Sequence, residues 1–475
     1  MCFKWDLFNL FASNTPSSRS CISVTTFNIL APIYNRSGSD KVQRESQNHD
    51  AWFTRNSNIL DLLISKGSII ICLQEFWLAN EEFVHLYKDS LGRQGYQIFT
   101  LLRSSDKGNG GGRGDGTGKG GGGGEGDGGK GDGGKGDGLL TAIKSERISV
   151  LGCEDVYFND LKGRVAQILH LRSPIYEKNG IAHVEFLLVN THLEYPHNSR
   201  HLLIRVWQAY KILDCLEQFK LQHHCSESVP VVLCGDWNGG KSDIVYKFLR
   251  SQGFVSSYDV VNGYKDSDVN KVVPCLVSHL NDYYWNINVL CLQWVSHKDH
   301  LGNVQGVDFI WLRDPRVHHE PLRLSWRKAA IHIIMKMMHE AGVSGEQILS
   351  STQSRDKTSL FDLLRELYQL SGKIVGNYIT QEIEGLMQNE YVDTEDLIDY
   401  SVQKTHIAPL DWARSFILSS IGSYRMLTLF VKPFPFVVKD ASLFPPRVEQ
   451  GVWPEDYALS DHACLSVTFN LRKLS

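Results

Sequence analysis

The sequence predicts an α/β protein in which two stacked β-sheets carry helices on their outer sides. Short apolar runs rich in β-branched residues alternate with stretches of helical periodicity up to residue 312. This order is typical of strand–helix–strand packing. The number of apolar runs, with a last one at the C-terminus, fits two stacked sheets better than one open sheet. A chain of 475 residues is long enough to bury a large core.

Each predicted element follows from its local pattern. The first run, ISVTTFNILA at residues 22–31, is apolar and β-branched and is followed by turn-forming residues. Further strands are predicted by the same criterion at 68–73, 139–143, 164–171, 184–190, 229–234, 304–312 and 464–470. Apolar residues at helical spacing predict amphipathic helices at 48–66 and 198–220.

A glycine-rich segment at 107–138 interrupts this pattern with repeated Gly-Asp-Gly-Gly-Lys units. Because it has no apolar side chain to bury, burial does not offset its conformational entropy. We therefore predict a disordered surface insertion. Its Gly-Lys pairs lack a following Ser or Thr and no strand precedes them, which excludes a phosphate-binding P-loop.

A second insertion is predicted at 321–424, where the sequence reads as several helices with short polar connections. It lies between the penultimate and the final predicted strand. It therefore divides the α/β domain into two parts, 20–320 and 425–472.

Bulk properties exclude some classes of protein. The net charge of −4 is not that of a general nucleic-acid-binding protein, so a phosphate substrate requires local charge or a metal ion. The ten cysteines are scattered singly, as in proteins of reducing compartments. No apolar run is long enough to span a bilayer, and we see no secretory signal. The expected location is cytoplasmic or nuclear.

Candidate functional residues lie where the predicted strands end. They are Asn28, Glu75, His192, Asp236, Asn238, Asp308, Asp461 and His462. Taken singly, most are explained as turn, cap or hydrogen-bonded structural residues. As an ordered set they supply what metal-assisted phosphoester hydrolysis needs: hard oxygen ligands for Mg²⁺, and histidines with carboxylates to orient them.

The motifs FNIL, CLQE, NTHL, GDWN, VDFIWL and SDH resemble those of the endonuclease/exonuclease/phosphatase superfamily. They look most like its deadenylase and nocturnin-like branch, and in particular like plant and algal calcium-binding members that carry an EF-hand-containing insertion. The resemblance covers about residues 20–312 and 425–472. It implies a deoxyribonuclease I-like two-sheet sandwich.

The resemblance also implies a metal site. Glu75 would be the principal metal carboxylate, Asn28 would support the metal, and Asp461 would lie beside it. The expected ion is Mg²⁺, with Mn²⁺ as a substitute.

Catalytic roles follow from the same resemblance. Asp236 would orient or deprotonate the attacking water, and Asn238 would hold a phosphate oxygen. His192 and His462 would hydrogen-bond the scissile phosphate, while Asp308 would fix the tautomer and orientation of His462. Charge builds on phosphoryl oxygens during such a reaction, so preorganised donors and a cation at that point lower the barrier.

Three functions are consistent with these residues. The first is a Mg²⁺-dependent phosphodiesterase, of the 3′–5′ exoribonuclease or deadenylase type, that acts on RNA. The second keeps the chemistry but takes a small phosphorylated molecule or a phospholipid as substrate. The third is an inactive scaffold that binds a partner through the helical insertion, which the presence of all eight motif residues disfavours.

Calcium binding by the insertion is a separate question. An EF-hand loop needs regularly spaced acidic ligands and a Glu at its twelfth position. The two registers that place Ile398 or Ile379 at the apolar eighth position end on Val402 and Ile383, so neither supplies that Glu. We therefore predict an EF-hand-like pair that has lost tight calcium binding. The alternative is weak binding through the acidic residues Asp393, Glu395, Asp396 and Asp399.

Overall fold

The structure, a computed structural model, describes residues 20–37, 43–104, 136–158, 160, 163–177, 180–196, 199–226, 229–241, 243–264, 294–299, 302–313, 436–448 and 459–471. The predicted helical insertion at 321–424 lies outside these residues, as does the glycine-rich segment up to residue 135. Both therefore stay predictions, as does the division of the chain into domains.

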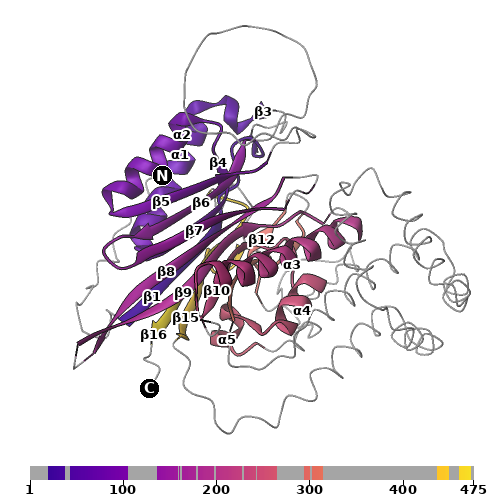
Figure 1. Cartoon of the computed structure of the whole chain (residues 1–475). Coiled ribbons are helices and arrows are strands. Elements are labelled where there is room, and N and C mark those ends of the chain that lie inside the picture. The colour runs from indigo at the N-terminus through magenta and orange to yellow at the C-terminus, as the bar shows by residue number, and fades with distance from the viewer. Residues whose placement is uncertain are drawn as a thin grey trace, which may run out of the picture.

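The first of two six-stranded sheets contains both ends of the described chain (Figure 1). Its strands, in spatial order, are β15 (Phe436–Phe444), β16 (Cys464–Leu471), β1 (Cys21–Asn28), β4 (Ile70–Trp77), β6 (Asp137–Lys144) and β5 (Tyr96–Leu102). Strands β1 and β4 run parallel and the other pairs are antiparallel, so the sheet is mixed.

The second sheet is mixed in the same way, with one parallel pair, β9 and β10. Its strands, in spatial order, are β11 (Phe254–Ser256), β14 (Asp308–Arg313), β10 (Val231–Asp236), β9 (Gly180–His192), β8 (Val165–Glu177) and β7 (Ser149–Tyr157). Two small two-stranded sheets pair β2 (Arg36–Ser37) with β3 (Gln43–Arg44), and β12 (His297–Lys298) with β13 (Val304–Gln305).

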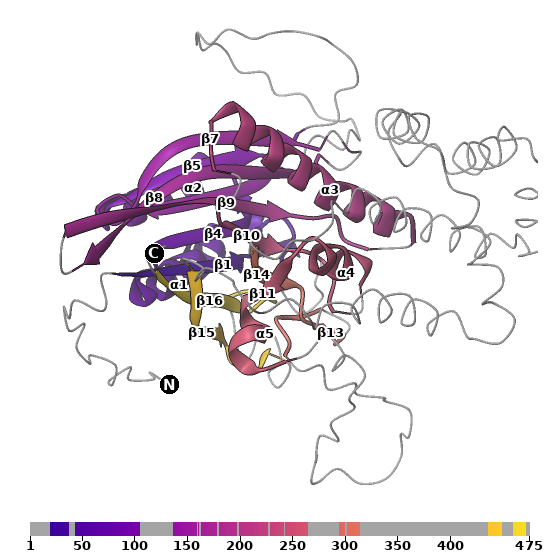
Figure 2. The same ribbon diagram turned by 60° about the horizontal axis from the view of Figure 1, so that its bottom comes forward.

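Helices cover the outer faces of the two sheets, as Figures 1 and 2 show. The helices are α1 (His49–Lys66), α2 (Glu81–Arg93), α3 (Ser199–Gln222), α4 (Ile244–Ser251) and α5 (Ser257–Asn262), with a short 3₁₀ helix at Glu45–Gln47. Helices α1 and α2 pack on the first sheet, whereas α3 and α4 lie on the side of the second sheet. The predicted two-sheet α/β sandwich is therefore confirmed. None of the helices in the described residues combines the length and apolar character needed to cross a membrane.

Strand β4 shows why the sequence folds into these layers. Ile70 and Cys72 belong to the core between the two sheets, while Ile71 and Leu73 pack against the helix layer of α1 and α2. Successive side chains of a strand point to opposite faces, so a strand covered on both sides is apolar throughout. This explains the uninterrupted apolar run from which the strand was predicted.

Several predicted strand boundaries were wrong, and two of the differences have a clear local cause. The strand predicted to begin at Leu139 begins at Asp137, because Asp137 pairs with Trp77 across the sheet and its buried carboxylate forms an ion pair with Arg103. The single strand predicted at 304–312 is divided into β13 and β14. Between them, Gly306 passes so close to Trp294 that an added Cβ would lie 3.0 Å from its carbonyl oxygen.

A buried ion pair holds together the segments that lead into and out of the first sheet. The guanidinium of Arg55, on α1, donates hydrogen bonds to the Glu45 carboxylate at 2.6 and 2.8 Å. It also donates to the backbone carbonyls of Ile29, Leu30 and Leu459 at 2.7–2.8 Å. These carbonyls follow β1 and precede β16, so one side chain ties two segments that are more than four hundred residues apart.

Replacement of Arg55 by Met should lower the free energy of unfolding by about 3–5 kcal/mol, because it leaves the Glu45 carboxylate buried without its partner. Urea denaturation measures the loss. Arg172→Met is the matched control, since the Arg172–Glu185 pair is about two-fifths exposed and a surface pair contributes about 0–1 kcal/mol. Equal losses for the two variants would contradict the prediction.

Candidate active site

The ends of three neighbouring strands bring together three of the predicted residues. Asp236, the last residue of β10, is paired with His192 at the end of β9 and with Asp308 at the start of β14. From the first sheet, Asn28 ends β1 and Glu75 lies near the end of β4. The two sheets thus present their polar strand ends to one another at the same edge of the sandwich.

Glu75 is directed to this edge by a β-bulge. The register between β4 and β6 shifts between Gln74 and Phe76, and Glu75 has a positive φ of 55°. A bulge of this kind leaves one residue unpaired and changes the direction of its side chain. The backbone N–H of Ala31 then donates to Oε2 of Glu75 at 3.2 Å. The carboxylate is therefore held in place from outside its own strand.

The carboxylate of Asp236 is the centre of the site. Its Oδ2 lies 3.0 Å from Nδ2 of Asn28, 3.4 Å from Nε2 of His192 and 3.7 Å from Nε2 of His462. Its Oδ1 accepts the backbone N–H of Asn238 at 2.8 Å. Four of the predicted residues, from four different segments, therefore meet at one carboxylate that is 1% exposed.

Asn238 is fixed by the turn that follows β10. It has a positive φ of 50°, and its Nδ2 donates to the carbonyl of Leu193 at 2.8 Å. The guanidinium of the fully buried Arg205 binds the carbonyl of Asn238 and the carboxylate of Asp243. The next residue must be glycine, because an added Cβ at Gly239 would collide with that guanidinium.

His192 is neutral and carries its proton on Nε2. Its Nδ1 lies 2.8 Å from Nη1 of Arg164, and because arginine can only donate, Nδ1 is the acceptor. Burial, followed by the charges of Arg164 and Arg103, lowers the pKa of His192 well below its usual value. The Nε2–H group therefore faces the centre of the site as a neutral donor.

His462 is in the opposite state. Its Nδ1 donates to Oδ2 of Asp308 at 2.9 Å, and Asp308 is itself positioned by a hydrogen bond from its backbone N–H to Oγ of Ser296. Burial alone would lower the pKa of His462, but the charges of Asp308 and Asp236 outweigh it and raise the pKa to about 10. At neutral pH the imidazole is cationic and its Nε2–H group faces Asp236.

Glu75 lies in an excess of negative charge. Burial, and then the charges of Asp137 and Asp461, raises its pKa to about 7. Burial also acts to raise the pKa of Asp461, but a hydrogen bond from His297 and the charge of His462 lower it to about 2. A cluster of hard oxygen donors with uncompensated charge suits a small divalent cation such as Mg²⁺. The donor set therefore fits the predicted ion.

Asn28 contacts the same carboxylates through its amide nitrogen. Its Nδ2 donates to Oε1 of Glu75 at 3.3 Å and to Asp236, while its Oδ1 accepts the backbone N–H of Leu30. In this orientation the amide nitrogen of Asn28 faces the carboxylates of Glu75 and Asp236, and its amide oxygen is turned toward the backbone of Leu30. Its predicted place among the metal ligands stays a prediction.

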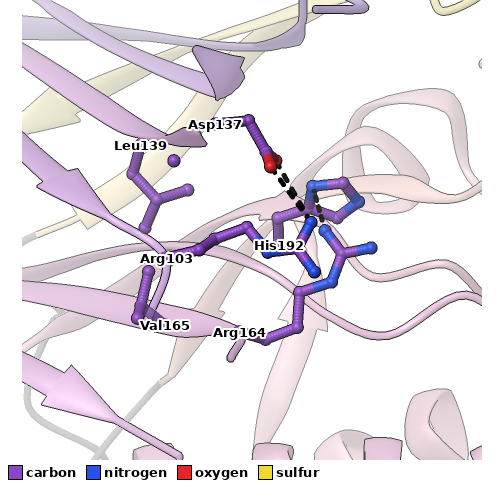
Figure 3. Close-up of a pocket in the computed structure, with 7 residues that line it drawn as sticks. Arg103, Asp137, Leu139, Arg164, Val165 and His192 are labelled. Atoms are coloured by element: carbon purple, nitrogen blue, oxygen red, sulfur yellow. Dashed lines mark hydrogen bonds and ion pairs between the residues drawn. The ribbon is translucent and has the colours of Figure 1, made fainter. Parts of the chain in front are cut away.

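Several polar neighbours of the site were not among the predicted residues. Asp137 accepts hydrogen bonds from Tyr34 at 2.7 Å and from Arg103 at 3.2 Å. With Arg164 and His192, Asp137 and Arg103 line a small pocket between β6 and the end of β9 (Figure 3). Asp137 lies just before the run 139–143 from which the strand was predicted, and this position is the signal that could have identified it. The sequence around Arg103 contains no motif, so only the folded structure shows that this residue contacts Asp137 beside the site.

Two other polar residues of the motifs have a structural role beneath the site. Gln74 donates to Oδ1 of Asn190 at 2.8 Å, and Asn190 donates to the carbonyl of Leu140 at 3.1 Å. Both side chains are fully buried between the sheets. Since buried amides are costly unless hydrogen-bonded, this bridge specifies how the two sheets align below the site.

Aromatic residues near the motifs are mostly part of the core. Trp237 is 1% exposed and packs edge-on against Trp311, so it cannot stack on a nucleobase. Trp77 packs against Trp52 and Phe83. Tyr195, which is 41% exposed, is an accessible aromatic side chain close in sequence to His192.

The chain is similar in sequence to a known protein family and to a plant protein. The model of the "Endonuclease/Exonuclease/phosphatase family" matches residues 25–462. An uncharacterized calcium-binding protein of Arabidopsis thaliana is 35% identical over 481 residues, which cover 98% of this chain and 87% of the plant protein.

Among solved structures, the human nocturnin catalytic domain with a bound sulfate anion is 18% identical, with a TM-score of 0.39 over 62% of this chain and 83% of that domain. A mannosyl-6-phosphatase of Bacteroides thetaiotaomicron is 16% identical, with a TM-score of 0.37 over 62% of this chain and 85% of that protein.

Proposed function

Because the chain belongs to the endonuclease/exonuclease/phosphatase family, we propose that it is a Mg²⁺-dependent phosphodiesterase that cleaves its substrate with water. One observation carries the proposal. Oδ2 of Asp236 lies within 3.7 Å of an amide nitrogen and two imidazole nitrogens, each from a different segment of the chain. The two imidazoles are held in opposite protonation states, which is typical of acid–base sites.

In the proposed mechanism the attacking water is bound and oriented by Asp236, which accepts its proton as the water oxygen bonds to phosphorus. The bond from phosphorus to the leaving oxygen breaks as the new bond forms, and the leaving oxygen takes a proton from solvent. The Nε2–H groups of His192 and the cationic His462 donate to the phosphoryl oxygens, where negative charge builds. Asn238 holds a phosphoryl oxygen. Glu75 and Asp461, with Asn28, are the proposed residues of the metal site, and Mg²⁺ supplies positive charge beside the phosphate when it is bound.

For the substrate we propose RNA, cleaved from its 3′ end, on the strength of the deadenylase-like motifs. The alternative is a small phosphorylated molecule or a phospholipid. It is favoured by the acidic net charge and by the burial of Trp237, which leaves few aromatic surfaces for stacking bases beside the site among the residues that the structure describes. An inactive scaffold is disfavoured by the connected set of side chains around Asp236.

Parallel turnover assays test the proposal. The full-length protein is incubated with oligo(A), NADP(H), inositol phosphates and sphingomyelin in Mg²⁺, with an EDTA arm and the variant Asp236→Asn as controls. We expect Mg²⁺-dependent release of nucleotides from oligo(A) that the variant lacks. Turnover of only a small molecule would select the alternative substrate, and no turnover in any arm would refute hydrolysis.

The same assays, repeated with Ca²⁺, address the insertion at 321–424. We propose an EF-hand-like helix pair without tight calcium binding. The name of the 35% identical Arabidopsis protein favours the alternative, in which Asp393, Glu395, Asp396 and Asp399 bind calcium. A change in turnover at micromolar Ca²⁺ in the presence of saturating Mg²⁺ would contradict the proposed loss of tight calcium binding.

A further inference from the structure

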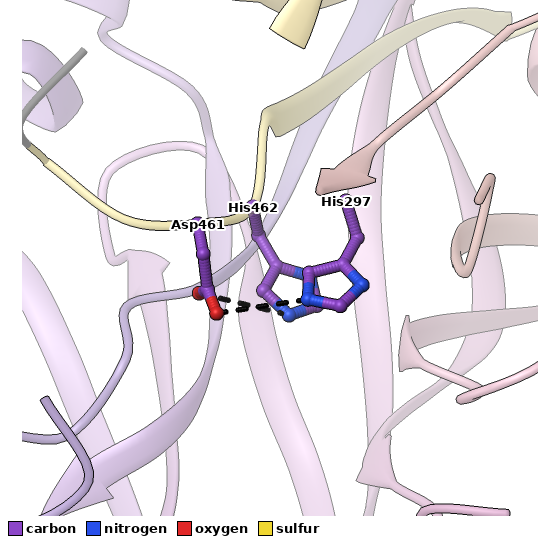
Figure 4. A group of neighbouring side chains, drawn as sticks. All are labelled: His297, Asp461 and His462. Atoms are coloured by element: carbon purple, nitrogen blue, oxygen red, sulfur yellow. Dashed lines mark ion pairs between the residues drawn. The ribbon is translucent and has the colours of Figure 1, made fainter. Parts of the chain in front are cut away.

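A second group of side chains that could bind a metal ion shares Asp461 with the proposed Mg²⁺ site and also contains nitrogen ligands. Nε2 of His297 lies 3.6 Å from Oδ2 of Asp461, and Nε2 of His462 lies 4.0 Å from Oδ1 of the same carboxylate. One ligand atom from each of the three residues falls within 4.8 Å of the others. Figure 4 shows the Asp461 carboxylate facing both imidazole rings.

The backbone holds these three residues together from two distant segments. His297 forms an isolated β-bridge with His462, and the N–H of Lys298 donates to the carbonyl of Asp461 at 3.1 Å. The two rings stack with their centroids 4.2 Å apart and an interplanar angle of 26°. Rotation of the His297 ring about its Cβ–Cγ bond changes the direction of Nε2 without any movement of the backbone.

The chemistry of this group differs from that of Glu75 and its neighbours. Two imidazole nitrogens and one carboxylate form a ligand set typical of borderline transition metals such as Zn²⁺ and Co²⁺, whereas Mg²⁺ prefers oxygen ligands. Nδ1 of His462 already donates to Asp308 at 2.9 Å, as metal-binding histidines commonly do, and Nε2 thereby faces Asp236 and Asp461.

Charge and access also favour a cation here. Three carboxylates surround His462, from Asp236, Asp308 and Asp461, and their negative charge attracts a divalent ion. The side chains of His297 and Asp461 are 14% and 23% exposed, so an ion can reach them from solvent.

We propose that His297, Asp461 and His462 bind a borderline divalent metal ion such as Zn²⁺, and that this ion inhibits the enzyme. A metal that binds Nε2 of His462 displaces the proton from that nitrogen into solvent, and this removes the donor that would contact the substrate phosphate. The inhibition rests on the function proposed above, whereas the binding site does not.

Binding is tested on the full-length protein in Mg²⁺-containing buffer. Zn²⁺ is titrated calorimetrically, and Co²⁺ is titrated while its visible d–d absorption is recorded. The test variant is His297→Asn, and the matched control is His85→Asn, which changes an exposed histidine on α2. The expected result is that His297→Asn weakens binding by at least about tenfold while the control binds as the unchanged protein does.

Co²⁺ also separates this site from the cysteines, because thiolate ligands add intense charge-transfer bands that an imidazole and carboxylate set lacks. Unchanged affinity in His297→Asn would overturn the proposal and favour Asp236, Asp308 and His462 as the ligands, since these form another compact group. Circular dichroism checks that the variant is folded, and His297→Gln replaces it if it is not.

A separate activity measurement tests the inhibition. The Zn²⁺ concentration for half-inhibition is determined relative to the Mg²⁺-supported rate of each variant, and it should rise at least about tenfold in His297→Asn. Zn²⁺ binding at His297 without inhibition would overturn the inhibitory role and leave the site intact. Absence of turnover in the unchanged protein would instead count against the function on which that role rests.

Discussion

Replacement of Asp236 by Asn should lower the turnover number for phosphodiester hydrolysis by about a thousandfold, while the protein stays folded. The carboxylate is expected to accept the proton of the attacking water, and loss of a positioned general base costs about 10²–10⁴ in rate. It also balances the charge of His462, whose Nε2 lies 3.7 Å from its Oδ2. Both contributions disappear when the charge is removed.

The change is nearly isosteric, so its effect on folding should be small. The thermal unfolding midpoint serves as the check. Asp214→Asn, which removes a carboxylate on the exposed side of α3, is the matched control and should retain full turnover. A purified Asp236→Asn protein whose turnover lies within threefold of the control would exclude Asp236 as the catalytic base.

The second large effect is expected for Glu75→Gln, which should weaken Mg²⁺ binding and lower turnover by at least about a hundredfold. Because the carboxylate binds the cation only in its ionised form, Mg²⁺ affinity of the unchanged protein should rise as the pH increases through about 7, where Glu75 loses its proton. Calorimetric titration of Mg²⁺ between pH 6 and 8 measures the affinity and its dependence on pH. The increase in affinity with pH should be smaller in Glu75→Gln than in the unchanged protein.

The pH dependence of the stability of the metal-free protein measures the ionisation of Glu75 independently of Mg²⁺ binding. The folded-state pKa of Glu75 is raised from 4.5 to about 7, so its ionisation costs stability. The cost is absent below pH 4.5, grows as the pH rises, and is complete above pH 7. Metal-free Glu75→Gln should therefore melt at a higher temperature than the unchanged protein at pH 8 and at the same temperature at pH 4. A lower melting temperature at pH 8 would mean that Glu75 stabilises the fold and would argue against a cation site.

Much of the fold follows from local patterns. Strands covered on both faces, such as β4 and β10, have continuous apolar runs and were predicted within a few residues. Strand β7 was missed because most of its side chains are exposed or half-buried and its pattern is weak. Helix α2 was missed because it spans only 13 residues between two strands. The start of β6 at Asp137 was misplaced because the pairing with Trp77 and Arg103 outweighs the neighbouring glycines.

The residue types and their order along the chain determined which chemistry is present. Carboxylates, amides and histidines at strand ends can be recognised without coordinates, because the carboxyl ends of parallel strands meet at a common edge of the sheet, together with the amino ends of strands antiparallel to them. The structure connects all eight predicted residues, from Asn28 to His462, by contacts of at most 4.0 Å. Their roles in catalysis stay predictions until the variants are measured.

Only the tertiary structure decided how each group is charged. Burial and the charge of Arg164 lower the pKa of His192, and burial with the charges of Asp137 and Asp461 raises the pKa of Glu75. The charges of Asp308 and Asp236 overcome burial and raise the pKa of His462. His297 likewise acquires its neighbours through a contact made across 165 positions of sequence. Protonation depends on burial and on charges a few ångströms away, and these neighbours lie far apart in the chain. A sequence pattern therefore identifies the side chains, whereas the fold determines their ionisation.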